Sequence, residues 1–215
     1  MFRKCGLQGQ YINNWLVIYL FDVENIIDFL KNRLSEKRFN HSLNVAAECR
    51  KLAEHYGEDP EKAYFAGLVH DICKEIPADE MRKMAAESGL GVSSAELQTK
   101  ALWHAVAGAA FVRDSLMVED KDIINAVRFH TIGRAGMSRL EEIVYIGDLI
   151  SADRSYNGVK KFRKLAYQDM DRVMLEALIF SIVSVTEKKG LIPEYTLEAY
   201  NQYALTESRR AQEGK

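Results

Sequence analysis

The amino-acid sequence predicts an all-α protein folded as a single domain, a bundle of helices. Helical spacing of apolar residues runs through most of the chain, whereas the alternating pattern of a strand is rare. The three prolines, Pro60, Pro77 and Pro193, each stand where a helical stretch begins, as proline in the first turn of a helix allows. The 215 residues suffice for a sizeable core, and no repeat or proline-rich linker divides them.

The predicted helices occupy residues 22–34, 38–56, 60–75, 78–88, 94–117, 120–131, 138–152, 157–166, 168–188 and 194–205. Gly57 and Gly89 follow two of these stretches and are expected to end helices. We expect residues 1–21 to form an N-terminal appendage of uncertain order, residues 22–207 the domain, and residues 208–215 a polar, frayed tail.

Composition limits the classes of function. The chain is 47% hydrophobic and 28% charged with a net charge of −2, so no basic field favours nucleic acid. The apolar run Trp15–Phe21 is far shorter than the roughly 20 residues that span a bilayer. Three cysteines without CxxC spacing indicate neither a disulfide framework nor a zinc knuckle. We therefore expect a cytoplasmic protein with no nucleic-acid or membrane partner.

The His70-Asp71 pair stands in an apolar stretch, residues 63–75, that is expected to be helical and buried. A buried histidine and aspartate must be hydrogen-bonded, paired or bound to a metal. By itself the dipeptide says little, because such pairs are common by chance.

Four further polar side chains continue the apolar stripes of predicted helices: His41, His104, His130 and Asp148. Taken singly, an inward histidine is more often bonded to a carbonyl in the core, and an inward aspartate is more often a cap or an ion-pair partner. Burying four histidines and two carboxylates from five helices is costly unless a common ligand binds them. Imidazole and carboxylate without thiolate suit a divalent transition metal such as iron, manganese or zinc.

Three neighbouring features have two readings each. Lys74 rises from the same predicted helix face as the His-Asp pair, so it either neutralises a phosphate beside a metal or pairs with a nearby carboxylate on the surface. His104 and His130 could donate to a phosphate or a leaving oxygen, or could hold a second metal. The basic run Lys160–Lys164 is read as a solvated helix face rather than a polyphosphate site.

The order of motifs resembles the HD-domain metal phosphohydrolases, and within them the YqeK family of symmetrical diadenosine tetraphosphate hydrolases. The resemblance covers residues 24–205. It is carried by Arg38-Phe-Asn-His41, His70-Asp71-Ile-Cys-Lys74, Trp103-His104, Arg128-Phe-His130-Thr-Ile-Gly133-Arg-Ala-Gly-Met137 and Tyr145-Ile-Gly-Asp148.

The resemblance implies an enzyme that cleaves diadenosine tetraphosphate into two ADP. It implies a metal, first of all iron with manganese, cobalt, nickel or zinc as alternatives, held by His41, His70, Asp71 and Asp148. It implies that Asp71, Lys74, His104 and His130 are catalytic. It also implies that Arg38, Lys74, His104, His130 and Arg154 face the phosphates, and that the segment 190–193, with Ile192 and Pro193, closes over the nucleotide. The alternative for this segment is an ordinary turn between two helices. The oligomeric state is left open, with a homodimer as one outcome.

Two departures from the family pattern stand out. Gly147-Asp148 replaces the usual Ala-Asp, and Gly147 would allow a close approach by another group. Ile150-Ser-Ala-Asp-Arg154 replaces Ile-Glu-Pro-x-Arg, which keeps the arginine but loses the glutamate and the proline that stiffens the turn. Two alternatives therefore stay open: a broader HD-type nucleotide phosphohydrolase, and a sensor that binds metal and nucleotide with little turnover.

Overall fold

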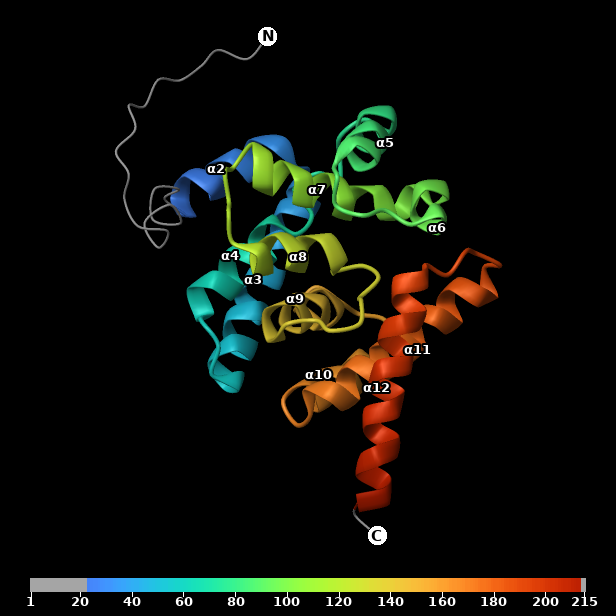
Figure 1. The fold of residues 1–215 in the computed structure, drawn as a ribbon. Helices are drawn as coiled ribbons and strands as arrows, with labels where there is room; N and C mark the ends of the chain where they lie inside the picture. Colours follow the sequence, from blue (N-terminus) through green and yellow to red (C-terminus); the bar gives the residue numbers. More distant parts are fainter. Residues whose placement is uncertain (1–22, 214–215) are drawn as a thin grey trace.

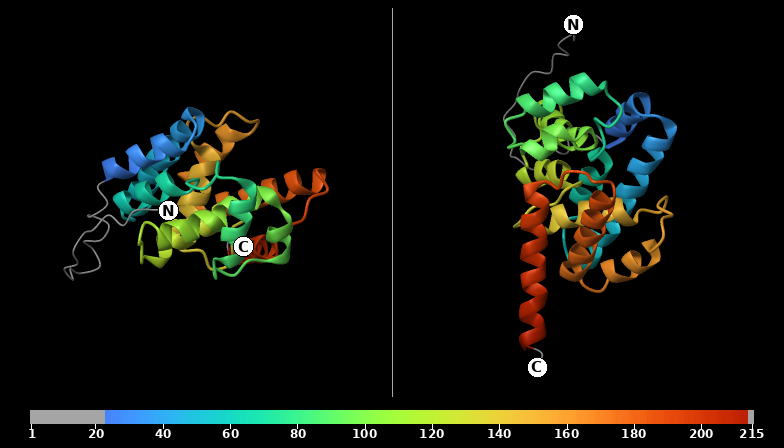
Figure 2. Two further views of the ribbon diagram at one scale, coloured as in Figure 1. Left: turned by 90° about the horizontal axis from the view of Figure 1, so that it is seen from above. Right: turned by 90° about the vertical axis from the view of Figure 1, so that its right-hand side faces the viewer.

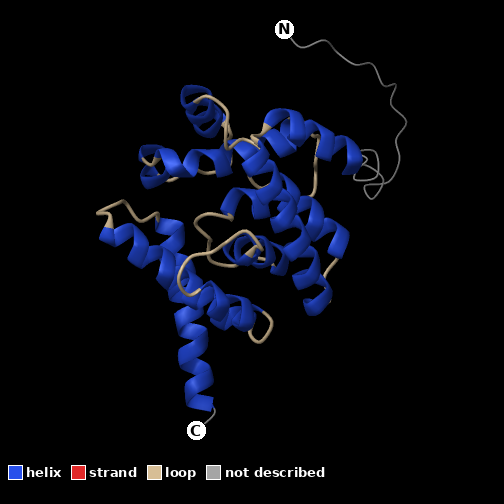
Figure 3. Ribbon diagram, turned by 180° about the vertical axis from the view of Figure 1, so that it is seen from behind, coloured by secondary structure: helices blue, strands red, loops and turns tan. Residues whose placement is uncertain are grey.

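The computed structural model describes residues 23–213, and this part of the chain contains helices and loops but no strand (Figure 3). The all-α prediction is confirmed. The predicted appendage, residues 1–21, lies outside the described residues.

The helices follow one another in the order α2 (Val23–Arg33), α3 (Glu36–Tyr56), α4 (Pro60–Val69), α5 (Ala78–Glu87), α6 (Ser94–Gln98), the 3-10 turn η1 (Lys100–Leu102), α7 (Trp103–Asp114), α8 (Lys121–Phe129), α9 (Arg139–Ile150), α10 (Val159–Ala166), α11 (Met170–Glu187) and α12 (Glu194–Glu213) (Figure 1). The C-terminal half of α12 extends beyond the other described helices in two perpendicular views (Figure 2).

Local chemistry explains where the central helices begin. The side chains of Asp59 and Asp120 accept hydrogen bonds from the first free N–H groups of α4 and α8. Helix α9 opens with a capping box in which Ser138 and Glu141 satisfy each other's main-chain N–H groups. Helix α3 ends as predicted at Gly57, whose φ of 74° is the left-handed conformation that glycine adopts without strain.

Helix α4 ends earlier than predicted, at Val69 rather than near residue 75. The chain continues in tight turns, with Ile72 N bonded to Val69 O at 3.1 Å and Lys74 N to Asp71 O at 2.9 Å. Ile72 and Cys73 are fully buried in these turns. The hydrophobic pattern therefore continues past the end of the helix, which is why it suggested a longer one.

Two other predicted boundaries also change. The helix expected at residues 94–117 is divided into α6, η1 and α7 because Thr99 has an extended backbone (φ −113°, ψ 96°). The indole N–H of Trp103, which bonds to Glu96 O and Leu97 O at 3.1 Å each, holds the chain folded back there. At the C-terminus, α12 continues through the predicted tail to Glu213, where Arg210 pairs with Asp169 at 3.2 Å.

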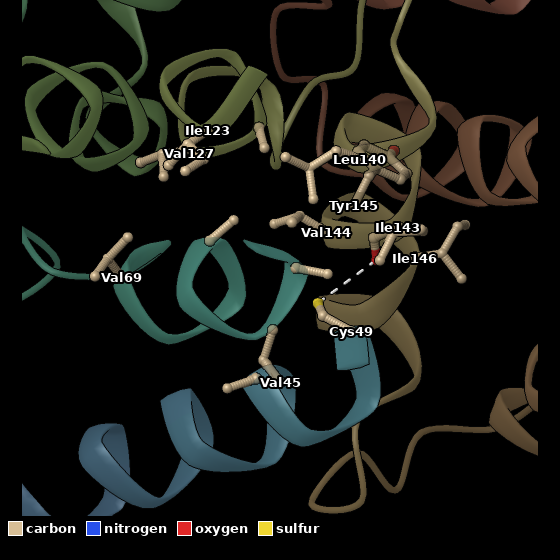
Figure 4. Close-up of a cluster of buried hydrophobic side chains, with 14 of the residues drawn as sticks. Val45, Cys49, Val69, Ile123, Val127, Leu140, Ile143, Val144, Tyr145 and Ile146 are labelled. Atoms are coloured by element: carbon tan, nitrogen blue, oxygen red, sulfur yellow. Dashed lines mark hydrogen bonds between the residues drawn. The ribbon is translucent and has the colours of Figure 1, made fainter. Parts of the chain in front are cut away.

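The core packs α3, α4, α8 and α9 against one another, as the close-up of buried side chains shows (Figure 4). Val45, Val69, Val127 and Ile143, one from each of these helices, are all fully buried. Each such side chain contributes on the order of 1.5–3 kcal/mol to the free energy of unfolding. The same four helices carry or immediately precede five of the six residues of the candidate site, and the sixth lies in α7, so the core fixes most of its geometry.

Among residues 23–213, the structure holds no helix with the length and apolar character needed to cross a bilayer.

Candidate metal centre

Six side chains converge between the central helices. His41 lies in α3, His104 in α7 and Asp148 in α9, whereas His70 and Asp71 directly follow α4 and His130 directly follows α8. The five other than Asp148 have relative exposures between 0% and 4%. The predicted inward positions are thus brought together in one buried cluster.

Two ligand atoms at the middle of this cluster lack hydrogen bonds. His70 Nδ1 lies 2.6 Å from Gly67 O and donates to it, which leaves Nε2 with its lone pair directed at the cluster. Neither His70 Nε2 nor Asp71 Oδ1 makes a well-aligned hydrogen bond to any described residue, although both atoms are buried and His104 Nε2 lies 3.2 Å from Asp71 Oδ1. Burial lowers the pKa of His70 to about 4, so its imidazole is neutral at pH 7. Buried atoms left in this way cost about 1–3 kcal/mol each unless a ligand satisfies them.

His41 joins the cluster to the end of α9. Its Nε2 lies 3.0 Å from Asp148 Oδ1, and its Nδ1 lies 2.8 Å from Asp153 Oδ2. Burial alone would lower the pKa of His41, but the Asp148 carboxylate outweighs it and raises that pKa. Burial would likewise raise the pKa of Asp148, yet the hydrogen bond from His41 and the nearby positive charges hold that pKa well below its usual range.

His104 and His130 both contact the Asp71 carboxylate, with their Nε2 atoms 3.2 Å and 3.6 Å from Oδ1. His130 Nδ1 donates to Val127 O at 2.7 Å, and the Nε2 atoms of the two histidines lie 3.2 Å apart. His104 Nε2 is also 3.2 Å from Asp71 Oδ1 and 2.9 Å from Lys74 Nζ. Burial lowers the pKa of His104 to about 4, so this imidazole too is neutral at pH 7.

The ligand atoms form three overlapping groups in which all lie within 4.8 Å of one another: His41, His70 and Asp71; His70, His130 and Asp148; and Asp71, His104 and His130. The overlap places every predicted metal ligand in at least one group. Imidazole nitrogens, among them those of the neutral His70 and His104, together with carboxylate oxygens fit a divalent transition metal.

Comparison with known proteins agrees with this geometry. The sequence from residue 38 to residue 153, more than half of the chain, matches the HD domain family. The chain belongs to the HD domain family. The HD centre is the name used below for the six residues His41, His70, Asp71, His104, His130 and Asp148.

Individual relatives show which members of the HD domain family this chain resembles. The chain is 33% identical over 178 residues to the symmetrical bis(5'-nucleosyl)-tetraphosphatase of Bacillus subtilis, covering 83% of this chain and 95% of the relative. It is 35% identical over 179 residues to the protein of the same name from Halalkalibacterium halodurans, again covering 83% and 95%. A crystal structure of a predicted HD superfamily hydrolase involved in NAD metabolism from Clostridium acetobutylicum superposes with a TM-score of 0.83 at 36% identity, covering 86% of this chain and 98% of that one. The predicted resemblance is confirmed.

Three cations stand against the carboxylates of the HD centre. Arg38 Nη1 lies 3.0 Å from Asp71 Oδ2, and Lys74 Nζ lies 3.6 Å from Asp71 Oδ1. Arg154 donates from Nε to Asp148 O at 2.9 Å and from Nη2 to the Asp148 carboxylate. Roughly a third of each cationic side chain is exposed, between 28% and 36%. Three of the predicted phosphate-facing residues are therefore partly exposed cations beside the carboxylates of the HD centre, and one of them, Arg154, lines a pocket.

One pocket adjoins the HD centre, and a second pocket adjoins the first. The smaller one, about 270 Å³, is lined by His130, Asp148 and Arg154 among others. The larger one, about 550 Å³, is lined mainly by apolar groups and includes Ile192 and Pro193. Thr131 and Ser181 line both pockets, so the pockets meet at these two hydroxyl groups. The predicted nucleotide-closing segment thus lies at the second pocket rather than against the HD centre itself.

Residues that the sequence did not single out hold the turn after α9. Arg163 donates to four main-chain oxygens of that turn, those of Ile150 at 2.9 Å, Ser151 at 2.7 Å, Arg154 at 2.9 Å and, more weakly, Ala152 at 3.5 Å. The expectation that residues 160–164 are only a solvated face was therefore wrong for Arg163. Asp153 was missed as well, because it lies in a turn where no helical spacing marks an inward position.

Proposed function

We propose that the protein hydrolyses diadenosine tetraphosphate at its central bridge and releases two molecules of ADP. The observation that carries this proposal is the pair of unsatisfied ligand atoms, His70 Nε2 and Asp71 Oδ1, at the middle of the HD centre. It occurs in a chain that covers 95% of relatives named for the symmetrical reaction. We place the enzyme in the cytoplasm, where reducing conditions suit a ferrous ion and the buried free thiols Cys49 and Cys73.

The metal ligands in this proposal are His41, His70, Asp71 and Asp148, with iron as the first candidate and manganese, cobalt, nickel or zinc as alternatives. The group formed by Asp71, His104 and His130 leaves room for a second ion. When bound, a divalent ion polarises a phosphoryl oxygen and lowers the pKa of water towards neutrality.

The chain's own cations supply the electrostatic part of catalysis. Arg38, Lys74 and Arg154 can donate to the non-bridging oxygens, where negative charge accumulates as the bridge breaks. Their positions are fixed in advance by Asp71 and by Asp148, so little reorganisation is needed when a phosphate arrives. Water then attacks a β-phosphorus and ADP leaves, which is easier than expelling a nucleoside because charge is already spread over phosphate oxygens.

His104 and His130 are suited to handling the proton of the leaving group. His104, neutral at pH 7, has its Nε2 2.9 Å from Lys74 Nζ and 3.2 Å from His130 Nε2, and His130 lines the smaller pocket. Because His130 Nδ1 is committed to Val127 O, only its Nε2 can face a phosphate. A positioned imidazole within hydrogen-bond reach contributes typically about 10²–10⁴ in rate.

The two adjoining pockets suit the shape of a dinucleotide. The phosphates would lie in the smaller pocket beside the HD centre, and a nucleoside would extend past Thr131 and Ser181 into the larger, apolar pocket with Ile192 and Pro193. This arrangement favours a polyphosphate-bridged substrate over a mononucleotide. It also implies that ADP, as product, inhibits.

The alternative of a sensor with little turnover rested on the changed turn at residues 150–154. Arg163 and the Arg154 N to Ser151 O bond at 3.0 Å hold this turn without the proline. Arg154 therefore keeps a fixed position, which favours an enzyme over a sensor. The broader phosphohydrolase differs only in substrate range.

The deciding experiment separates early products by ion-exchange chromatography. Purified protein, loaded separately with iron, manganese or zinc, is given diadenosine tetraphosphate, the triphosphate and pentaphosphate homologues, and NAD. ADP as the sole early product of the tetraphosphate supports the proposal. AMP with ATP, or faster cleavage of NAD, would replace it with another reaction, and metal-loaded protein without cleavage would favour the sensor.

A further inference from the structure

A short chain of hydrogen bonds reaches His41 from outside the HD centre. Ser151 Oγ donates to Asp153 Oδ1 at 2.9 Å, and Asp153 Oδ2 lies 2.8 Å from His41 Nδ1. Because an ionised carboxylate only accepts, the proton of this second bond belongs to His41 Nδ1. By the same rule, His41 Nε2 donates to Asp148 Oδ1, 3.0 Å away, while no ion is bound, so a bound ion replaces the Nε2 proton and leaves the one on Nδ1.

His41 differs from two of its partners in how its ring is held. His70 and His130 each donate Nδ1–H to a main-chain oxygen of their own helix, Gly67 O at 2.6 Å and Val127 O at 2.7 Å. Their orientation is therefore a property of the backbone. The Nδ1 atom of His41 instead bonds to the side chain of Asp153, 112 residues away in the sequence, so one substitution can remove this bond.

The segment that presents Asp153 is itself fixed. Arg163 of α10 donates to the main-chain oxygens of Ile150, Ser151 and Arg154 around it. Ser151 is fully buried, while 37% of the Asp153 side chain is exposed. Asp153 is thus held for its carboxylate contacts and not for packing.

We propose that Asp153 is a positioning residue that keeps His41 in the Nδ1–H form with Nε2 turned towards the metal. The inference rests on the proposed function in one respect, that an ion binds at His41. Asp153 is not a ligand itself, because it bonds to Nδ1, on the opposite edge of the ring from the Nε2 that faces Asp148. Loss of such a partner behind a metal-binding histidine typically lowers metal affinity or activity by about 10–100-fold.

The first test reads the ring directly and needs no metal. Two-bond ¹H–¹⁵N correlation spectra of the metal-free protein at pH 8 distinguish the two neutral imidazole forms and the doubly protonated ring, and His41→Gln identifies the signal of His41 by its absence. In wild type a proton is expected on Nδ1, alone or together with one on Nε2, whereas in Asp153→Ala the Nδ1 proton should be lost and Nε2–H should remain, donating to Asp148. Wild-type protein whose Nδ1 carries no proton would overturn the proposal, whatever the variants do.

The second test measures Mn²⁺ affinity by competition with a chelator. Asp153→Ala is expected to bind Mn²⁺ about 10–100-fold more weakly, with kcat recovering at saturating metal, whereas a merely structural defect would not be rescued. Asp153→Asn, whose amide oxygen still accepts from Nδ1–H, should stay within a few-fold of wild type. Ser151→Ala should fall between them, and Glu58→Ala, an exposed carboxylate on a loop, should match wild type.

The possible results separate failure of the orienting role of Asp153 from failure of the proposed function. Wild-type affinity in Asp153→Ala, or an equal loss in Asp153→Asn and Asp153→Ala, would overturn the orienting role. If Asp153→Ala does not fold, the wild-type spectrum and the affinity of Asp153→Asn still test it. Wild-type protein that binds no metal would sink the proposed function instead, while the spectrum would still show whether Asp153 sets the form of His41.

Discussion

The thiol of Cys49 occupies the space that a side chain at residue 147 would need: a β-carbon on Gly147 would come within 2.6 Å of Cys49 Sγ. Cys49 cannot easily turn away, because Sγ also faces Gly67 and bonds to Ile143 O at 3.7 Å (Figure 4). Gly147→Ala is therefore expected to lower the free energy of unfolding by about 1–3 kcal/mol through overpacking. Because α9 carries Asp148 next to it, metal affinity should fall as well. Thermal denaturation and metal titration measure the two effects.

The matched control removes the thiol. In the double variant Cys49→Ala with Gly147→Ala, the new methyl group fills the vacated space, so stability and metal affinity should return most of the way to wild type. A double-mutant cycle then gives a favourable coupling between the two positions. Strictly additive effects of the two substitutions would show that the contact is not the cause.

Metal removal is the second prediction. An ion that binds the folded state but not the unfolded one stabilises the protein by about 2.7 kcal/mol at 100 times its Kd. A chelator should therefore lower the Tm of wild type by about 5–10 °C, given about 2–4 °C per kcal/mol for a chain of this size. His70→Ala and Asp71→Ala should lose the ion and show no response to chelator.

His55→Ala is the control for this experiment, because His55 is an exposed histidine outside the HD centre. It should respond to chelator as wild type does. An unchanged Tm in wild type, together with no metal by elemental analysis, would contradict the assignment of the ligands.

The third prediction separates phosphate contacts from metal ligands. Lys74→Ala and Arg154→Ala remove cations that touch the carboxylates of the HD centre without belonging to any of the ligand groups. Each should keep the wild-type metal content and lose about 10²–10³ in kcat, as expected when a preorganised donor is removed. Lys160→Ala, an exposed lysine in α10, is the control and should keep both. Loss of metal in Lys74→Ala or Arg154→Ala would mean that the cation holds the ligands in place.

The sequence predicted the parts of the site that lie on regular helices. His41 stands one turn before the buried Val45, and Asp148 one turn after the buried Val144, so the hydrophobic stripe marked both as inward. Asp71 could be predicted to be buried even though its helix ends earlier than expected, because the buried Ile72 continues the apolar pattern through the turn.

The remaining features depend on contacts that no periodic pattern encodes. Asp153 and Arg163 act on an irregular turn, where burial is partial and spacing carries no information about direction. No glycine or proline marks the break at Thr99. The break is held instead by the indole N–H of Trp103, which donates to Glu96 O earlier in the chain. The length of α12 was underestimated because Arg210 reaches a carboxylate of another segment, Asp169.

His104→Ala is the fourth prediction and addresses the number of ions. If one ion is held by His41, His70, Asp71 and Asp148, the variant should keep the full metal content while losing about 10²–10⁴ in rate, because an imidazole positioned to hydrogen-bond the reacting phosphate is gone. If the group of Asp71, His104 and His130 holds a second ion, wild type should contain two ions per chain and the variant one. Elemental analysis after gel filtration decides, and complete metal loss would contradict both arrangements.

The last prediction concerns the larger pocket. Ile192 lines it beside Pro193, and the pocket meets the smaller one at Thr131 and Ser181. Ile192→Trp should fill part of its volume and raise KM for diadenosine tetraphosphate about tenfold, equivalent to about 1.4 kcal/mol of binding. The inhibition constant of ADP should rise with it, while metal content stays constant, because Ile192 touches no residue of the HD centre in any contact described. Leu197→Trp, on the exposed side of α12 and outside the pocket, should leave KM unchanged. An unchanged KM in Ile192→Trp would mean that the nucleoside lies elsewhere and that this pocket plays no part in substrate binding.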